Sequence, residues 1–178
     1  MPYLFKPVAW DELNDLARVH VLSWQQTYAG LVPQDYLDNL SISAREESWR
    51  RVFRSHQESA VQIAYHDYDA IGFISFGKAR DKDKEGQGEI YAVYVLKENW
   101  GEGIGYMLFK IAKDGFLRQG ITSAYLWSLE GNQRALQAYK RWGGVADYSR
   151  TKDEEIGGQV LKDVMVNFNF VAGKPPLR

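Results

Sequence analysis

Apolar residues recur with a helical period in several stretches of the chain. Predicted helices cover residues 11–28, 43–56, 104–119 and 132–142, with a short turn at residues 35–40 between the first two. Asp11 is a plausible N-cap for the first helix, and Gly30 and Pro33 stop it. His20 falls on the apolar stripe of that helix and is expected to be an interior histidine.

Alternating or continuous apolar runs predict strands at residues 3–8, 60–65, 70–76, 89–95, 123–128, 145–150 and 160–170. The run at residues 89–95 is apolar on both faces, which is typical of a strand buried in the middle of a sheet. Because helices and strands interleave, the predicted fold class is α/β (α+β) with a sheet of mixed direction.

Composition narrows the function classes. The 178 residues fit one domain, expected to span residues 1–172, with a flexible tail at 173–178. Lys and Arg number 22 against 23 Asp and Glu, which argues against nucleic acid as the main partner. There is no cysteine, the three histidines lack ligand spacing, and no metal site is expected. Without a signal peptide or an apolar run of spanning length, the expectation is a cytoplasmic protein with no membrane partner.

Two segments carry a chemical signal. Gly101, Gly103 and Gly105 follow the apolar strand and open a helix. Unpaired N–H groups and the positive end of the helix dipole make such a turn an anion site, and glycines let a phosphate approach the backbone. A dinucleotide fingerprint needs glycine at 106, where Tyr106 stands, so a nucleotide-binding oxidoreductase is a minor alternative.

The second segment is Asn132-x-x-Ala135-x-x-x-Tyr139-x-x-x-Gly143. With the glycine turn, Trp100-Gly101-Glu102-Gly103-Ile104-Gly105, it resembles the two hallmark motifs of the GNAT superfamily of acetyl-CoA-dependent N-acetyltransferases. The likeness in element order extends from about residue 3 to residue 170. Trp100 departs from the pattern, because the family usually has Gln or Arg at this position.

The resemblance implies a mixed, largely antiparallel sheet whose central strands splay apart, flanked by helices, with acetyl-CoA bound in the gap as cosubstrate. The residues expected to bind it are Val93, Tyr94, Val95, Trp100, Gly101, Glu102, Gly103, Ile104, Gly105, Tyr106, Asn132, Ala135 and Tyr139. It further implies acetyl transfer to a primary amine by direct attack in a ternary complex. A non-catalytic acyl-CoA-binding module is the alternative.

Two residues are candidates for proton transfer. Tyr139 is predicted to protonate the leaving thiolate. Glu89 begins the buried strand on the face predicted for Tyr91, Val93 and Val95, and is the candidate general base. Both have a plainer reading, Tyr139 as a core aromatic and Glu89 as a solvated carboxylate.

The acceptor is not specified by the sequence. Trp24, Tyr28 and Tyr36 are candidates for an acceptor pocket, although aromatic stripes are more often core. A small-molecule amine and a protein N-terminus both stay open as acceptors, and a homodimer stays open as the assembly.

Overall fold

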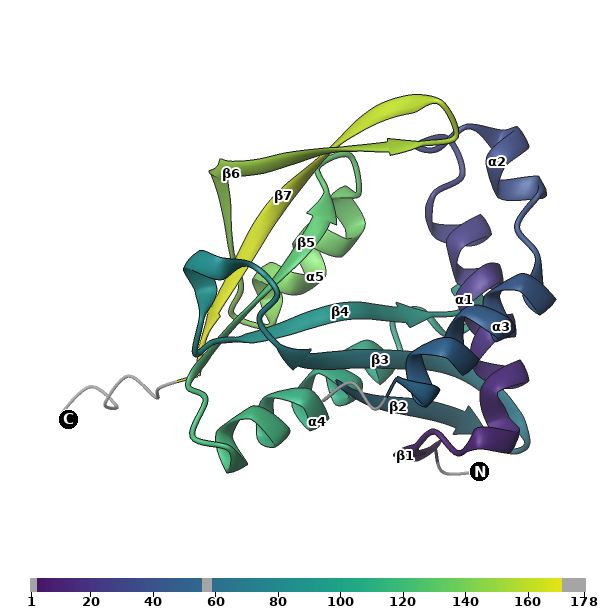
Figure 1. Ribbon diagram of the computed structural model, residues 1–178, viewed down its shortest axis with the longest axis horizontal. Coiled ribbons are helices and arrows are strands. Elements are labelled where there is room, and N and C mark those ends of the chain that lie inside the picture. The colour runs from purple at the N-terminus through teal and green to yellow at the C-terminus, as the bar shows by residue number, and fades with distance from the viewer. Residues whose placement is uncertain (1–2, 56–58, 171–178) are drawn as a thin grey trace, which may run out of the picture.

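The computed structural model describes residues 3–55 and 59–170. Its framework is one seven-stranded sheet in the order β1-β2-β3-β4-β5-β7-β6 (Figure 1). The strands are β1 (Tyr3–Pro7), β2 (Ser59–His66), β3 (Asp69–Lys78), β4 (Gly88–Val95), β5 (Ser123–Leu129), β6 (Val145–Ile156) and β7 (Gln159–Asn169). Every pair is antiparallel except β4–β5.

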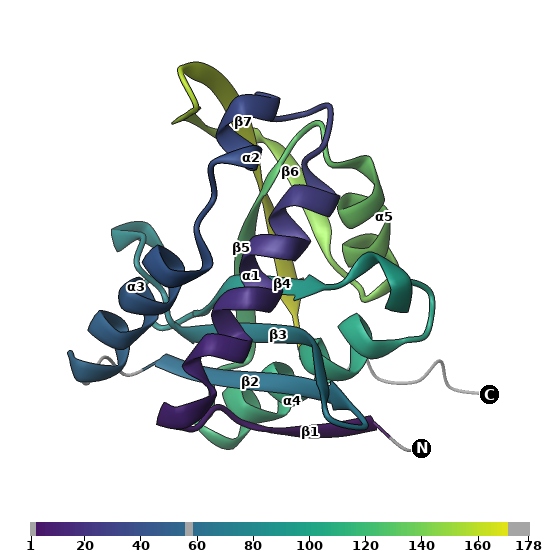
Figure 2. The ribbon, with the colours of Figure 1, turned by 90° about the vertical axis from the view of Figure 1, so that its right-hand side faces the viewer.

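Helices cover both faces of this sheet. Helices α1 (Leu13–Thr27) and α3 (Ile42–Arg54) lie on one face of β2–β4, and α4 (Ile104–Arg118) lies on the other (Figure 2). Each face has its own core: Leu13, Leu16 and Phe73 belong to the first, whereas Leu108, Phe116 and Val166 belong to the second. Among the described residues, no helix has the length and apolar character needed to cross a membrane.

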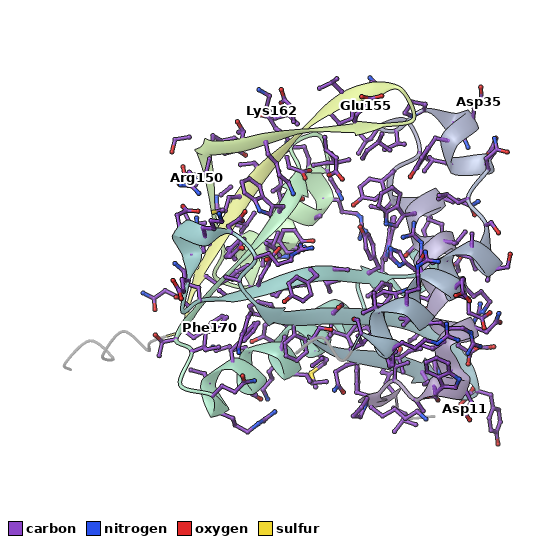
Figure 3. All side chains as sticks on the ribbon, viewed as in Figure 1. Asp11, Asp35, Arg150, Glu155, Lys162 and Phe170 are labelled. Atoms are coloured by element: carbon purple, nitrogen blue, oxygen red, sulfur yellow. The ribbon has the colours of Figure 1, made fainter. Side chains whose placement is uncertain are left out.

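The two remaining helices stand at the upper end of the sheet as drawn in Figure 1. Helix α5 (Gln133–Arg141) follows β5, and α2 (Gln34–Asp38) meets the tip of the β6–β7 hairpin. A Cβ added to Gly157 at that tip would lie 2.7 Å from the Cβ of Tyr36, so the contact requires glycine. Figure 3 shows Glu155 and Lys162 on the hairpin and Asp35 on α2.

The predicted splay is confirmed. Strands β4 and β5 pair only through Gly88↔Ala124 and Glu89↔Tyr125, and beyond these residues they separate. Gly88 is required where they meet, because an added Cβ would lie 2.4 Å from the Phe116 ring. A gap between two central strands leaves unpaired backbone groups that need partners.

The structure corrects several element boundaries. Asp11 is not the N-cap of α1, because residues Trp10–Glu12 form a 3-10 turn and α1 begins at Leu13. Strand β6 continues to Ile156, beyond the predicted residue 150. The prediction stopped early because the second half of the strand is exposed and charged and shows no apolar period. The predicted helix end at His56 and the predicted tail at 173–178 lie outside the described residues.

Candidate active site

A cavity of about 300 Å³ lies where β4 and β5 separate. Its walls come from β4, the turn between β4 and α4, the end of β5, helix α5 and the last turn of α1. Of the predicted cosubstrate-binding residues, all line it except Glu102. The Glu102 carboxylate instead accepts a hydrogen bond from the Tyr3 hydroxyl at 2.6 Å, outside the cavity.

The backbone of β4 offers polar groups to this cavity. The Leu96 N–H donates to the Ile71 carbonyl, so Leu96 is bonded toward β3. Because bonding direction alternates along an antiparallel strand, the N–H and C=O groups of Val95 and Val93 point away from β3 and into the gap. Tyr94 therefore has its backbone toward β3, and its hydroxyl contacts Tyr28 on the α1 side.

The glycine turn has the backbone geometry that an anion site needs. Gly101 and Gly103 have φ of +87° and +81°, in the left-handed region that glycine adopts without strain. Gly103 is the N-cap of α4, so the first N–H groups of that helix have no acceptor within the helix, and Gly103, Ile104 and Gly105 all line the cavity.

Helix α5 brings Tyr139 to the cavity. Asn132 is its N-cap, and the Asn132 side-chain oxygen accepts a hydrogen bond from the Ala135 N–H at 3.2 Å. Tyr139 is 9% exposed and packs edge-on against Trp142, and burial raises the pKa of its phenol. The phenol therefore keeps its proton through the neutral and alkaline range, and among the described residues no hydrogen bond occupies its hydroxyl.

Glu89 lies elsewhere than expected. A register shift at Ser75/Phe76 makes Ile90 and Val93 share the α4 face, so Glu89 does not share a face with Val93 and Val95. That part of the prediction is wrong, because the bulge inverts the alternation after residue 90.

The Glu89 carboxylate is 2% exposed and does not line the cavity. It accepts hydrogen bonds from the Arg80 backbone N–H at 2.8 Å, from the Arg80 guanidinium at 2.5 Å and 3.1 Å, and from the Tyr125 hydroxyl at 2.9 Å. The Arg80 bonds join the loop after β3 to the start of β4, and the Tyr125 bond joins β4 to β5. Glu89 therefore stabilises the contact among Arg80, β4 and β5, and its role as general base stays a prediction.

Of the three aromatic residues expected at the acceptor side, Tyr28 lines the cavity. Its hydroxyl and that of Tyr94 are 2.9 Å apart, and burial raises the pKa of both phenols, that of Tyr94 to about 12. Trp24 and Tyr36 pack behind Tyr28 in a cluster with Leu129 and Ile156. They position the cavity wall rather than form its surface.

His20 is an interior histidine, as predicted. It is 8% exposed, and its Nδ1 accepts a hydrogen bond from the Trp49 indole at 3.2 Å. Burial, with a smaller contribution from Arg45, lowers its pKa to about 3, so the imidazole is neutral at physiological pH.

A buried carboxylate on β7 was not anticipated. Asp163 is 5% exposed, and its nearest cation is Lys152 on β6 at 3.6 Å. Burial raises its pKa to about 6, and Glu154 reinforces the shift while Lys152 opposes it. Its charge contributes to the raised pKa values of Tyr28 and Tyr94, so it lies near the pair of hydroxyls at the cavity wall.

Several residues that line the cavity are not among those predicted from the sequence. Trp127 and Ser128 at the end of β5 and Arg134 and Arg141 on α5 all line the cavity. Arg134 stands at a position of the Asn132 motif where the motif requires no particular residue, and its positive charge is the feature of the sequence that could have indicated a binding role. Among the described residues, no group of three or more acidic or histidine side chains is arranged to hold a metal.

Comparisons with known proteins agree with this geometry. The family model described as acetyltransferase (GNAT) family matches residues 18–144. A Bacillus subtilis protein described as the uncharacterized N-acetyltransferase YuaI is 32% identical over 157 residues, 86% of each chain. A mycothiol acetyltransferase of Mycobacteroides abscessus is 29% identical over 135 residues, 73% of this chain and 41% of that protein.

Solved structures share the fold. The PaiA N-acetyltransferase of Thermoplasma acidophilum, in complex with coenzyme A, superposes with a TM-score of 0.75 at 20% identity, covering 95% of this chain and 99% of that one. A ribosomal-protein-alanine N-acetyltransferase from Brucella melitensis gives a TM-score of 0.71 at 16% identity, with 93% and 99% coverage. With the family model and the YuaI relative, these matches show that the chain belongs to the acetyltransferase (GNAT) family.

Proposed function

We propose that this acyltransferase moves the acetyl group of acetyl-CoA to a primary amine by direct attack in a ternary complex. The observation that carries the proposal is that one cavity joins the splayed β4 backbone, the glycine turn and Tyr139. A small molecule or a protein N-terminus fits the role of acceptor. The coenzyme A in the PaiA structure supports a CoA thioester as donor.

The cosubstrate is held chiefly by backbone. The N–H groups at the start of α4 meet its phosphates, and Gly101 and Gly103 keep Cβ atoms out of their way. The N–H and C=O groups of Val93 and the N–H of Val95 pair with the amide-containing arm, because β5 does not reach them.

The transfer needs a neutral amine, an oxyanion site and a proton for the leaving thiolate. The amine nitrogen bonds to the thioester carbonyl carbon, and the backbone N–H groups beside the gap stabilise the developing oxyanion. The carbon–sulfur bond then breaks, and the Tyr139 phenol donates its proton to the sulfur. The raised pKa of Tyr139 keeps this proton available across the working pH range.

The proton that the amine loses needs an acceptor. Glu89 is the general base proposed from the sequence, and it would have to act through water, because its carboxylate is buried outside the cavity and engaged by Arg80 and Tyr125. An amine that arrives unprotonated needs no strong base, so turnover then rises with pH as free amine accumulates.

A non-catalytic acyl-CoA-binding module is the second candidate, because the glycine turn would serve binding alone. A thiol-release screen separates the two. The purified protein is mixed with acetyl-CoA and an amine library, and free thiol is measured with a colorimetric reagent. The chain has no cysteine, so every thiol detected is CoA. Amine-dependent release supports the enzyme, and binding of acetyl-CoA without release from any amine contradicts it.

A further inference from the structure

Arg134 and Trp100 meet inside the cavity although they lie far apart in the chain. Trp100 follows the 3-10 turn after β4, and Arg134 is the second residue of α5. The guanidinium carbon of Arg134 lies 3.2 Å from the centre of the Trp100 ring, and both side chains line the cavity beside Gly101. This is a stacked cation–aromatic contact at close range.

The Trp100 ring is fixed in place by a second contact. Its indole Nε1 donates a hydrogen bond of 2.8 Å to the Val95 carbonyl at the end of β4. That carbonyl points into the gap, and the indole supplies the partner that β5 does not. The ring therefore cannot rotate freely, and the guanidinium stacked on it has a restricted set of orientations.

Arg134 carries a charge that the described residues do not neutralise. None of the ion pairs among the described residues involves Arg134, and no hydrogen bond among them occupies its guanidinium. Burial lowers the pKa of Arg134, and the Tyr139 phenol is the group that counteracts this effect. A partly desolvated cation without a counter-charge costs free energy, which an anion in the cavity would recover.

The position of Arg134 on its helix also favours an anion in the cavity. It stands in the first turn of α5, where the helix dipole is positive and a cation is disfavoured. The dipole, the guanidinium and the N–H groups of the glycine turn all attract negative charge to one region. A planar guanidinium matches a phosphate with two parallel hydrogen bonds.

We propose that Trp100 and Arg134 form a phosphate-binding pair, in which Trp100 positions the Arg134 guanidinium against a phosphate group of the CoA cosubstrate. This inference rests on the proposed function, because it requires a CoA thioester in the cavity. The phosphate comes either from the diphosphate or from the 3′-phosphate of CoA, and truncated donors distinguish them.

The test compares Arg134→Gln with the parent on three donors: acetyl-CoA, acetyl-dephospho-CoA and acetyl-pantetheine. A charge-assisted hydrogen bond is worth enough to expect a loss of roughly 10- to 100-fold in kcat/KM for acetyl-CoA. No loss is expected for acetyl-pantetheine, which has no phosphoryl group beyond the pantetheine. If the diphosphate is bound, acetyl-dephospho-CoA behaves like acetyl-CoA; if the 3′-phosphate is bound, it behaves like acetyl-pantetheine.

Trp100 is tested as a positioning residue through its coupling to Arg134. Trp100→Leu removes the platform, so Arg134→Gln is expected to cost several-fold less in that background than in the parent. Trp100→Phe keeps a ring to stack on and is expected to retain most of the Arg134 effect. Arg51→Gln is the matched charge control, because Arg51 is exposed on α3 and does not line the cavity.

Two results overturn the pair. Equal losses of Arg134→Gln on acetyl-CoA and acetyl-pantetheine would make Arg134 a structural residue, and no loss on either would remove it from binding. Calorimetry of the parent with CoA keeps this failure distinct from that of the proposed function. A parent that binds no CoA contradicts both proposals, whereas a parent that binds CoA while Arg134→Gln binds it equally well contradicts the pair alone.

Discussion

The two walls of the cavity are built in different ways. One wall, on which we propose that CoA binds and which we call the cosubstrate wall, consists of the Val93–Val95 backbone, the glycine turn at 100–105 and the start of α5. The other, on which we propose that the amine binds and which we call the acceptor wall, consists of Tyr28 and Tyr94 with Trp24, Tyr36 and Asp163 behind them. The first works through backbone geometry, and the second through side chains brought together from α1, α2, β4 and β7.

This difference has a functional consequence. A backbone wall recognises what every CoA thioester shares, so a few glycines and an N-cap are enough to build it. A side-chain wall can change with each substitution while the fold stays the same. Under the proposed function, the acceptor wall therefore selects the amine, and its residues belong to no short sequence motif.

The largest effect is expected in the cosubstrate wall at Gly103. Gly103→Val places a β-branched residue at a φ of +81° and sets side-chain atoms beside the α4 N–H groups. The dissociation constant of acetyl-CoA, measured by calorimetry, is expected to rise about 100-fold, because charge-assisted hydrogen bonds to phosphate are lost.

The matched control for Gly103→Val is Gly86→Val. Gly86 has a φ of +84° and, like Gly103, nothing within 4 Å of an added Cβ, but it lies on an exposed loop outside the cavity. It carries the same backbone strain without touching the site. Affinity of Gly103→Val within twofold of the parent would remove the phosphate role of the turn.

The next largest effect is expected at Tyr139, where the two walls meet. Tyr139→Phe keeps the ring and its contact with Trp142, so folding and the KM for acetyl-CoA are expected to change little. Loss of the proton donor is expected to lower kcat roughly 10- to 100-fold, the lower part of the range for general acid catalysis, because a thiolate is a stable leaving group.

The pH profile sharpens the Tyr139 test. Burial raises the pKa of Tyr139, so the parent is expected to show no alkaline fall in kcat below about pH 10, the ordinary tyrosine value. A kcat for Tyr139→Phe equal to the parent's at all pH values would leave Tyr139 as a packing residue.

A smaller effect, on stability, is expected at Glu89. Glu89→Gln removes the charge that holds Arg80 and leaves buried donors without a full set of acceptors. We expect unfolding free energy to fall by about 1–3 kcal/mol, seen as a lower Tm in a thermal melt. If Glu89 is also the general base, turnover falls mainly at low pH and recovers as pH rises. A defect in turnover that does not depend on pH would leave only the structural role.

The smallest effect is expected at Asp163, where substitution is expected to raise the stability of the protein rather than lower it. Its pKa is raised from 3.8 to about 6, so the folded state holds a proton that the unfolded state has lost between these values. The stability contribution of this carboxyl is therefore greatest below pH 3.8 and declines as pH rises through 6. Asp163→Asn is expected to raise Tm by roughly 2 to 6 °C at pH 7.5.

The pH dependence distinguishes this explanation from a general packing gain. The difference in Tm between Asp163→Asn and the parent should shrink as pH falls from 6 and disappear near about pH 3, where the parent carboxyl is protonated in both states. A difference that is constant from pH 4 to pH 7.5 would show that the ionised carboxyl is not the cause. A lower Tm at pH 7.5 would show that the ion pair with Lys152 outweighs the burial cost.

Of the residues predicted to bind the cosubstrate, all but Glu102 line the cavity, because the determinants of this wall are local. The strand, the glycine turn and the helix are consecutive in the chain, and glycine is the residue type that permits the positive φ found at Gly101 and Gly103. The separation of β4 from β5 was predicted from the resemblance to the GNAT superfamily, and the β4–β5 pairing, which ends at Glu89, confirms this prediction.

The arrangement of the acceptor wall could not be predicted from local sequence, because it depends on long-range contacts. Trp24 and Tyr36 lie behind the cavity surface, and nothing in the sequence near Asp163 indicates that β7 brings it close to Tyr28 on α1. Glu89 shows a different limit. One extra residue in β4 changed the face that it occupies, and a period of two cannot reveal such a bulge.

Acetyl transfer at this cavity is tested most directly by the stoichiometry of one reaction. The protein is mixed with acetyl-CoA and the amine that releases most thiol, and CoA, acetylated amine and the mass of the denatured protein are followed together. Direct transfer predicts equal amounts of CoA and acetylated amine, with the protein mass unchanged throughout. CoA release without acetylated amine, or an acetylated protein that forms before the product, would contradict it.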